Sequence, residues 1–399
     1  MRIKNFFSLL LIFYSSTGLS AEWSGQIGVE VRLFTESAAY TQQHGHNSSV
    51  YLQPEFYHQF ESGNSSFTFV PYLRIDQHDN ERSHADIREL TWVNVQDNLE
   101  WRVGIRKVFW GVTESQHLVD IINQTDSVDS TDGEEKLGQP MLNLSYITDI
   151  GSFDVFVLPY FRERTFAGKD GRLRTQPYVD TSTVFYESSK KEKHIDYALR
   201  WAHSIDEWDL GVSYFSGTSR DPRFIVGTDS SGASVLNPYY DVIQQAAVDL
   251  QATYGSWLWK LESIHRAGIG GASNNSYNAF AGGVEYTFYS AIGEATDIGL
   301  VFEYLRDDRG ESATTPFQKD VMLGIRFNLN DEQSTDALIG VIKDLDKDAA
   351  IYSFEANRRL TNNLKLSVEA RKYSNLTPAD ILYSYLKDDY VQIEFVYYF

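Results

Sequence analysis

The chain of 399 residues carries 35 Lys and Arg against 55 Asp and Glu, a net charge of −20 that argues against a basic, phosphate-binding surface and hence against nucleic-acid partners. The absence of cysteine excludes disulfide scaffolds and thiolate metal sites, and a mean hydropathy of −0.35 excludes a bundle of membrane-spanning helices. Aromatic residues make up 14% of the chain, which is atypical of disordered proteins.

The first twenty residues have the features of a secretory signal peptide. Arg2 and Lys4 precede an apolar segment, Phe6–Tyr14, that is too short to span a membrane as a helix, and small residues follow at Gly18 and Ser20. We expect cleavage near Ser20 and Ala21, so that residues 21–399 form the exported domain.

Beyond this leader, short segments with alternating apolar and polar residues recur along the chain. Such a period of two predicts β-strands. We expect about eighteen strands, with sixteen as the alternative count. The predicted segments are 23–34, 47–60, 65–77, 84–95, 100–111, 138–148, 152–166, 194–204, 207–219, 240–254, 257–268, 276–290, 297–308, 316–329, 335–345, 349–360, 364–375 and 388–399.

The last segment and the connections favour a barrel over a soluble β-sandwich. In Tyr390–Phe399 the residues Phe395, Tyr397 and Phe399 share one face, which resembles the terminal signal that bacterial outer-membrane barrels present to their assembly machinery. Short and long connections alternate, as in barrels with periplasmic turns and extracellular loops, and a sandwich does not require this. We therefore predict an all-β fold, a single transmembrane antiparallel β-barrel in the outer membrane of a Gram-negative bacterium. Tryptophans near the strand ends are typical of an interfacial girdle: Trp101, Trp110, Trp208, Trp257 and Trp259.

The third outer loop, Val112–Leu137, is the predicted constriction. Its apolar run Leu118–Ile122 suits packing against the inner wall, and its second half supplies an acidic edge. The carboxylates of that edge are Asp126, Asp129, Asp132, Glu134 and Glu135. A solvated surface loop and a Ca²⁺ site remain alternatives, although the spacing does not match the EF-hand pattern. We expect no resident metal.

The segment Gly104–Gly111, which ends in Trp110-Gly111, is followed by Asn123-Gln-Thr-Asp126. This pattern resembles poorly characterised porin-like outer-membrane β-barrel proteins of Gram-negative bacteria, in which a strand ends in Trp-Gly and the next loop carries Asn-x-x-Asp. The chain departs from that pattern at Gln124, where those proteins usually have proline. The resemblance implies a channel and names no solute.

If the strands keep their alternation, charged residues line the lumen in two sectors. The predicted basic sector contains Arg102, Arg106, Arg162, Arg164 and Arg200, and the predicted acidic sector contains Asp209, Asp249, Glu262, Glu285 and Glu303. Facing sectors of opposite charge would orient dipolar solutes. Alternatively, these charges pair with neighbours within the wall. Inward tyrosines also suggest a surface for stacking sugars: Tyr51, Tyr57, Tyr72 and Tyr160.

We predict a porin-like channel for passive diffusion of small hydrophilic solutes. The alternative is a receptor, an adhesin or a secretion-associated barrel that acts through its extracellular loops. An enzyme is disfavoured because neither Gly-x-Ser-x-Gly nor His-Glu-x-x-His occurs. The expected partners are outer-membrane lipid, lipopolysaccharide bridged by loosely held divalent cations, the barrel-assembly machinery and two further copies in a trimer. No cofactor is expected.

Overall fold

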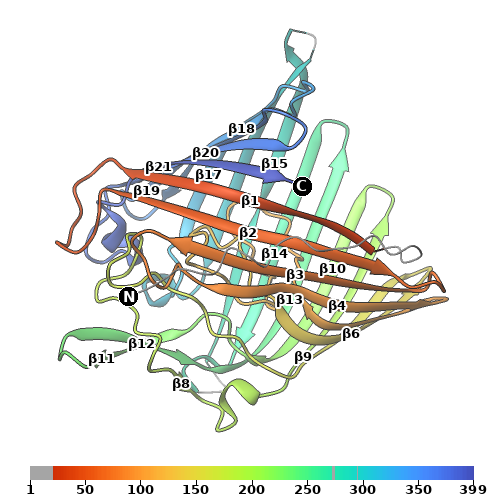
Figure 1. Ribbon diagram of the computed structural model, residues 1–399, viewed down its shortest axis with the longest axis horizontal. Helices are drawn as coiled ribbons and strands as arrows, with labels where there is room; N and C mark the ends of the chain where they lie inside the picture. Colours follow the sequence, from red (N-terminus) through yellow and green to blue (C-terminus); the bar gives the residue numbers. More distant parts are fainter. Residues whose placement is uncertain (1–20, 272–274, 294) are drawn as a thin grey trace, which may run out of the picture.

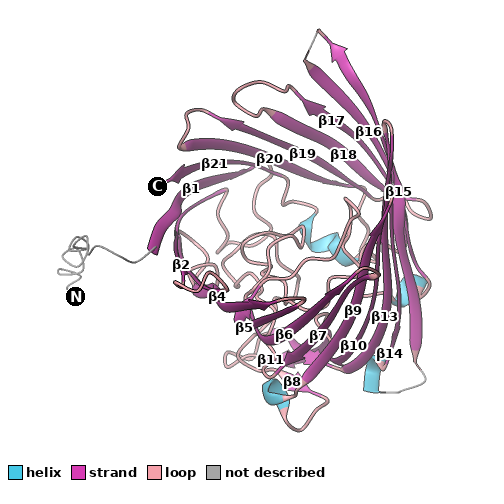
Figure 2. Ribbon diagram, turned by 90° about the vertical axis from the view of Figure 1, so that its right-hand side faces the viewer, coloured by secondary structure: helices cyan, strands magenta, loops and turns pink. Residues whose placement is uncertain are grey.

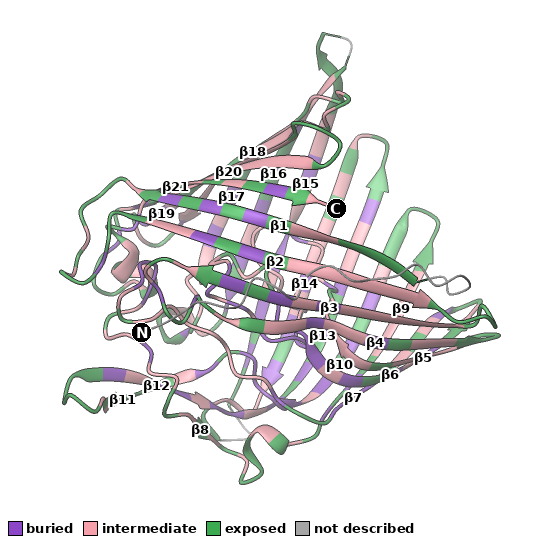
Figure 3. Cartoon of the chain, in the orientation of Figure 1, coloured by how far each residue is buried: buried purple, intermediate pink, exposed green. Residues whose placement is uncertain are grey.

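The strands each have two different faces, because successive side chains of a strand point in opposite directions (Figure 3). On β17 (Lys319–Asn328), the side chains of Leu323 and Ile325 are 53% and 41% exposed on one face. The side chain of Met322, on the other face, is only 4% exposed. Exposed apolar side chains continue this outer face on other strands of the sheet: Ile27, Val29, Val31, Leu300, Phe302, Ile339, Val391, Ile393 and Phe395. Such an outward apolar band is typical of a barrel surrounded by lipid.

The structure, a computed structural model, describes residues 21–271, 275–293 and 295–399. Within these residues, eighteen strands form one antiparallel sheet that curls into a closed barrel (Figures 1 and 2). The barrel strands are β1 (Ala21–Phe34), β2 (His46–Gln59), β3 (Ser65–Asp76), β4 (Ala85–Gln96), β5 (Leu99–Arg106), β6 (Gln139–Thr148), β7 (Gly151–Leu158), β9 (Asp196–Ile205), β10 (Trp208–Thr218), β13 (Val242–Tyr254), β14 (Trp257–Ala267), β15 (Ser276–Ile292), β16 (Thr296–Asp307), β17, β18 (Asp336–Asp344), β19 (Ala350–Arg359), β20 (Leu364–Ser374) and β21 (Tyr390–Tyr398).

The barrel closes where the first strand meets the last. β1 pairs with β21 along Gln26–Phe34, and the backbones of Gly25 and Phe399 exchange two hydrogen bonds of 3.0 Å. The predicted fold class is confirmed, and each predicted strand segment coincides with one barrel strand. Eighteen strands, rather than sixteen, therefore form the described barrel.

Short turns and longer connections alternate around most of the barrel. The exception is β17 to β19, where the connection 329–335 is longer than the connection 345–349 that follows. The long connections also carry a small sheet of β8 (Phe185–Tyr186), β11 (Arg223–Thr228) and β12 (Ser234–Tyr240), which the sequence did not predict. Four short 3-10 helices complete the described elements: η1 (Lys191–Lys193), η2 (Ile269–Gly271), η3 (Gly310–Ser312) and η4 (Ile381–Tyr385). No helix in the described part of the chain is long and apolar enough to cross a membrane.

Two predicted strands end earlier than expected. β7 stops at Leu158, because the next residue is Pro159, which has no N–H for the sheet. β5 stops at Arg106, and the chain then turns into the barrel, so Trp110 lies in the interior at 9% exposure instead of in a girdle. The predicted signal peptide lies outside the described residues.

Candidate functional site

The connection between β5 and β6, residues 107–138, folds into the barrel, and we call it the inner loop. Figure 2 shows loop segments filling part of the space inside the ring of strands. Asn123 closes the neck of the inner loop: its Oδ1 accepts from the Val108 N–H at 2.9 Å, and its Nδ2 donates to the carbonyls of Arg106 and Leu137 at 2.7 and 2.8 Å. A single asparagine thus ties both ends of the loop together.

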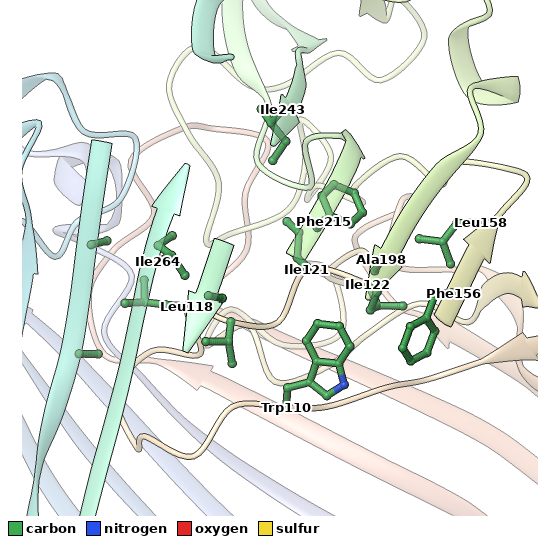
Figure 4. Packing of buried hydrophobic residues seen from close by; sticks show 14 of the residues in the cluster. Trp110, Leu118, Ile121, Ile122, Phe156, Leu158, Ala198, Phe215, Ile243 and Ile264 are labelled. Carbon is green, nitrogen blue, oxygen red and sulfur yellow. The ribbon is translucent and has the colours of Figure 1, made fainter. Parts of the chain in front are cut away.

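The first half of the inner loop is held by an apolar core inside the barrel (Figure 4). Val119, Ile121 and Ile122 are at most 1% exposed. They belong to one cluster with inward residues of the wall: Phe156, Leu158, Ala198, Phe215, Ile243, Ala247, Ile264, Ala279 and Ala281. The predicted packing of the Leu118–Ile122 run against the inner wall is confirmed.

The same segment contains the Trp-Gly motif, and its role is structural. The backbone N–H groups of Trp110 and Gly111 both donate to Asp120 Oδ1, at 2.7 and 3.1 Å. A Cβ at position 111 would lie 2.4 Å from His117 Nδ1, so only glycine fits there without a shift. The motif therefore builds the bend that brings the inner loop onto the wall.

Two carboxylates of the predicted acidic sector anchor the inner loop to the wall. Glu262 of β14 is fully buried and accepts from the backbone N–H groups of Val112, Thr113 and Val119 at 2.7, 2.9 and 3.1 Å. It also accepts from the Thr113 hydroxyl at 2.7 Å. The sequence did not show that this wall carboxylate has a partner in a loop almost 150 residues away.

Glu303 of β16 does the same for the next two residues of the inner loop. It accepts from the N–H groups of Glu114 and Ser115 at 2.7 and 2.9 Å and from the Ser115 hydroxyl at 2.5 Å. Glu262 and Glu303 thus serve as anchors and are not free charges of the lumen.

The first two residues of the predicted acidic edge are buried in ion pairs, which corrects their expected exposure. Asp126 lies 2.8 Å from Arg88 Nη1 and accepts from the Thr165 hydroxyl at 2.7 Å. Asp129 contacts Arg74 Nε at 2.9 Å and also pairs with Arg88. The loop's second half is therefore fixed to β3 and β4 by inward arginines.

The other three carboxylates of the edge remain more accessible. Asp132 contacts Arg371 of β20 at 3.4 Å, and Glu134 accepts from His117 Nε2 at 2.8 Å. Glu135 lies 3.5 Å from Lys107 at the loop neck. Asp132 and Glu134, but not Glu135, line the large cavity described below.

In the predicted basic sector, Arg102 and Arg200 are paired with carboxylates, whereas Arg106 contacts a neutral amide. Arg102 contacts Glu100 at 2.6 Å and Asn143 at 3.0 Å, and Arg106 donates to Asn143 at 3.1 Å. Arg200 forms a two-pronged pair with Asp249, at 2.6 and 2.7 Å. Pairing within the wall, the alternative to a free sector, describes these residues better.

Arg162 and Arg164 are not on a strand, because β7 ends before them. Arg162 contacts Asp86 at 2.8 Å, and Arg164 contacts Asp221 at 2.8 Å beside the cavity. Of the remaining acidic residues, Asp209 is exposed near a short turn and accepts from Ser204, whereas Glu285 lies 3.4 Å from Arg326.

Of the four inward tyrosines predicted to stack sugars, Tyr51 and Tyr72 are covered by arginines, and Tyr57 of β2 is half-buried. The guanidinium of Arg74 lies 5.0 Å from the ring centroid of Tyr51, and that of Arg88 lies 4.2 Å from the ring of Tyr72. Tyr160 lies beyond the end of β7 in an exposed segment. Tyr51 and Tyr72 therefore present no free face to a solute.

A cavity of about 610 Å³ remains between the inner loop and the wall from β14 to β20. Sequence reasoning missed most of its charged lining, because arginines on separate strands and loops meet only in the folded barrel. The missed basic residues are Lys136, Arg220, Arg266, Arg309 and Arg371, and the missed acidic residues are Glu114, Asp120, Asp221, Asp307 and Glu355.

Three basic side chains that line this cavity are Lys136, Arg266 and Arg309. Lys136 of the inner loop is only 6% exposed, lines the cavity and has no ion-pair partner among the described residues. Burial lowers the pKa of Lys136, and Asp120 is the acidic group that most opposes this shift. The guanidinium of Arg309 lies 3.6 Å from the ring centroid of Tyr277, and Arg266 pairs with Asp221 at 2.8 Å.

His84, Asp126 and Asp129 bring three metal-type ligand atoms within 4.8 Å of one another. The guanidinium groups of Arg74 and Arg88 already contact both carboxylates. A Ca²⁺ ion needs six to eight oxygen ligands and a negative surrounding field, which these arginines remove. The cluster fits an ion-pair network and not a cation site.

No known family matches the chain, and no curated protein matches it. Among solved structures, a triple mutant of the Rhodopseudomonas blastica porin is 12% identical over 95% of this chain and 100% of its own, with a TM-score of 0.45. OmpT of Vibrio cholerae, described as a trimer form, is 8% identical over 96% and 99%, with a TM-score of 0.49. The fold of the described residues is a closed antiparallel β-barrel of eighteen strands. At these low identities and scores, the function has to be inferred from the geometry of this chain alone.

Proposed function

We propose that the protein is a passive diffusion channel for small hydrophilic solutes in the outer membrane of a Gram-negative bacterium. The observation that carries this proposal is a loop folded inside a closed eighteen-stranded barrel, beside a cavity of about 610 Å³. Barrels of 16–18 strands are wide enough for an aqueous lumen. The inner loop narrows that lumen and is anchored at both of its halves, as expected for a fixed size filter.

The lining of the cavity favours polar solutes. Arg164, Arg266 and Arg309 gather around Asp221 and Tyr277 on one side. Glu114 reaches Lys260 and Arg326, and Asp132 and Glu355 both contact Arg371. Charges of both signs around a narrow polar passage orient dipolar solutes and penalise apolar ones, which lose hydration there.

The proposal also includes the contacts of the barrel with lipid, the assembly machinery, lipopolysaccharide and other copies of the chain. The outward apolar band supports insertion into lipid, and Phe395, Tyr397 and Phe399 on the closing strand supply the signal for the assembly machinery. Contact with lipopolysaccharide through divalent cations and assembly as a trimer complete it. In this proposal the protein lets solutes pass and does not change them chemically.

Proteoliposome swelling tests the proposal. Vesicles that contain the purified protein are placed in isosmotic solutions of neutral sugars of increasing size. We expect swelling with small sugars and a sharp loss with larger ones. Vesicles that contain the folded protein yet do not swell in any sugar would contradict a diffusion channel.

One observation favours the alternative of a receptor or adhesin. The β11 strand leaves Phe224, Ile225 and Val226 exposed on the small outer sheet, and Val226 is 72% exposed. Replacing these three residues by serine separates the two functions. A channel should keep its swelling rate, whereas an adhesin should lose attachment of cells that display it.

A further inference from the structure

Three histidines from two segments of the chain meet at the end of the barrel that carries the long connections. His44 lies in the connection 35–45, His46 begins β2, and His78 lies in the connection 77–84. The rings of His44 and His78 stack with centroids 3.7 Å apart and planes 15° apart. The ring of His46 meets His78 edge-on at 5.5 Å.

These three rings lack the polar partners that four other histidines of the chain have, and the rings of His58 and His203 have none within the described residues either. His84 contacts the Arg82 carbonyl, His117 bridges Glu134 and Glu262, His194 contacts Asp196, and His265 contacts Asn278. No ring nitrogen of His44, His46 or His78 has a hydrogen-bond partner within the described residues, and Nε2 of His78 is buried without one. The nitrogens of the three rings do not yet converge, since the ligand atoms that lie within 4.8 Å of one another in the described residues are those of His84, Asp126 and Asp129. A metal ion would therefore require the exposed rings to rotate.

The frame around His78 is rigid. Asp76 Oδ1 accepts from the N–H groups of His78 and Asp79 at 3.0 and 2.9 Å, and Asp76 Oδ2 pairs with Arg82 at 3.1 Å. In contrast, His44 and His46 are exposed and flank Gly45, whose Cβ position has no neighbour within 4 Å. The two exposed rings can therefore turn toward a fixed third one.

The positive charge of Arg82 is compensated. Arg82 is engaged by Asp76 and Glu30, so it presents no free positive charge to a bound cation.

We propose that His44, His46 and His78 bind one divalent transition-metal ion at the outer mouth of the barrel. Imidazole nitrogens favour Zn²⁺, Cu²⁺ and Ni²⁺, whereas Mg²⁺ and Ca²⁺ prefer oxygen ligands. Binding replaces the stacking of His44 on His78 by convergence of the three rings, and water completes the coordination. The bound ion joins the connection 35–45 to the connection 77–84, so the outer mouth becomes stiffer when metal is present.

The test is metal binding by the folded, full-length barrel without a histidine tag. Isothermal titration with Zn²⁺, and visible absorption of Co²⁺ as a spectroscopic probe of nitrogen coordination, are measured in detergent. We expect one equivalent of Zn²⁺ in the wild type and no comparable binding of Mg²⁺. The variant H265A, which removes a histidine elsewhere on the chain, is the matched control and should bind as the wild type does.

The variants H44A and H78A should each weaken Zn²⁺ binding by about tenfold or more, the range seen when supporting groups of metal sites are lost. His44 lies in an exposed connection, so H44A tests the site even where H78A fails to fold. Wild-type and H44A barrels that bind Zn²⁺ equally, or a wild type that binds none, would overturn the proposal. Solute transport does not enter this test, so its outcome is independent of the proposed channel function.

Discussion

Replacing Glu262 and Glu303 by alanine should loosen the inner loop and widen the passage. E262A leaves three backbone N–H groups without their acceptor, at about 1–3 kcal/mol each when they stay buried. E303A removes two more such bonds. Together these losses of free energy are comparable with the roughly 6–12 kcal/mol expected from burying the four apolar side chains of residues 118–122.

These magnitudes decide which part of the inner loop moves. In the double variant E262A/E303A, residues 112–116 keep only side-chain contacts and should loosen. These contacts run from Glu114 to Lys260 and Arg326 of the wall and from Gln116 to Thr315. Residues 118–122 keep their apolar packing and should stay in place. We therefore expect a partial widening: a single variant should change conductance slightly, and the double variant should raise it clearly.

The assay is single-channel recording in planar bilayers, together with swelling in sugars just above the wild-type size limit. D209A is the matched control, because it also removes one carboxylate, but from an exposed turn with Ser204 as its partner. Heat-modifiability on gels verifies that each variant is a folded barrel. A folded E262A/E303A barrel with wild-type conductance and size limit would refute the anchoring role.

Four further outcomes follow from the structure. Deletion of Phe399 removes its two backbone hydrogen bonds to Gly25 and the terminal aromatic, so barrel levels in the membrane should fall strongly; normal levels would contradict the closure. Ile325→Arg places a charge on the outward face and should cost about 2–4 kcal/mol in unfolding experiments in lipid, and an unchanged stability would place Ile325 away from lipid. Burial alone would lower the pKa of His117, but its contacts with Glu134 and Glu262 raise this pKa to about 10. The protonated ring therefore stabilises the inner loop fully below the ordinary pKa of 6.5, and this stabilisation is lost as the pH rises through about 10. Conductance should rise in that pH range in the wild type and show no such step in H117Q. K136Q removes the unpaired cation of the cavity and should shift the reversal potential toward cations; an identical reversal potential would exclude Lys136 from the ion path.

The strands could be predicted from the sequence because alternation is a local property. In β17, the apolar residues Leu323, Ile325 and Phe327 alternate with Gly324, Arg326 and Asn328, and a lipid-facing barrel needs that pattern whatever its neighbours are. The packing of Leu118–Ile122 followed from the same logic, since an apolar run in a long loop needs an apolar surface.

The partners of charged residues could not be predicted, because they depend on register and on the path of the loops. Glu262 was expected to face an open lumen, and it does face inward, but the inner loop covers it. Arg164 was placed on a strand because the alternation continues past Leu158, while Pro159 removes the N–H that the sheet would need. His78 meets His44 only because β2 and β3 pair side by side in the sheet.

Single-channel recording of the wild-type protein tests the central claim, that a fixed inner loop narrows an open aqueous barrel. Purified, heat-modifiable protein is added to a planar bilayer in potassium chloride. The geometry predicts discrete current steps of uniform size. Barrels that insert but pass no current, both as wild type and as E262A/E303A, would contradict the channel.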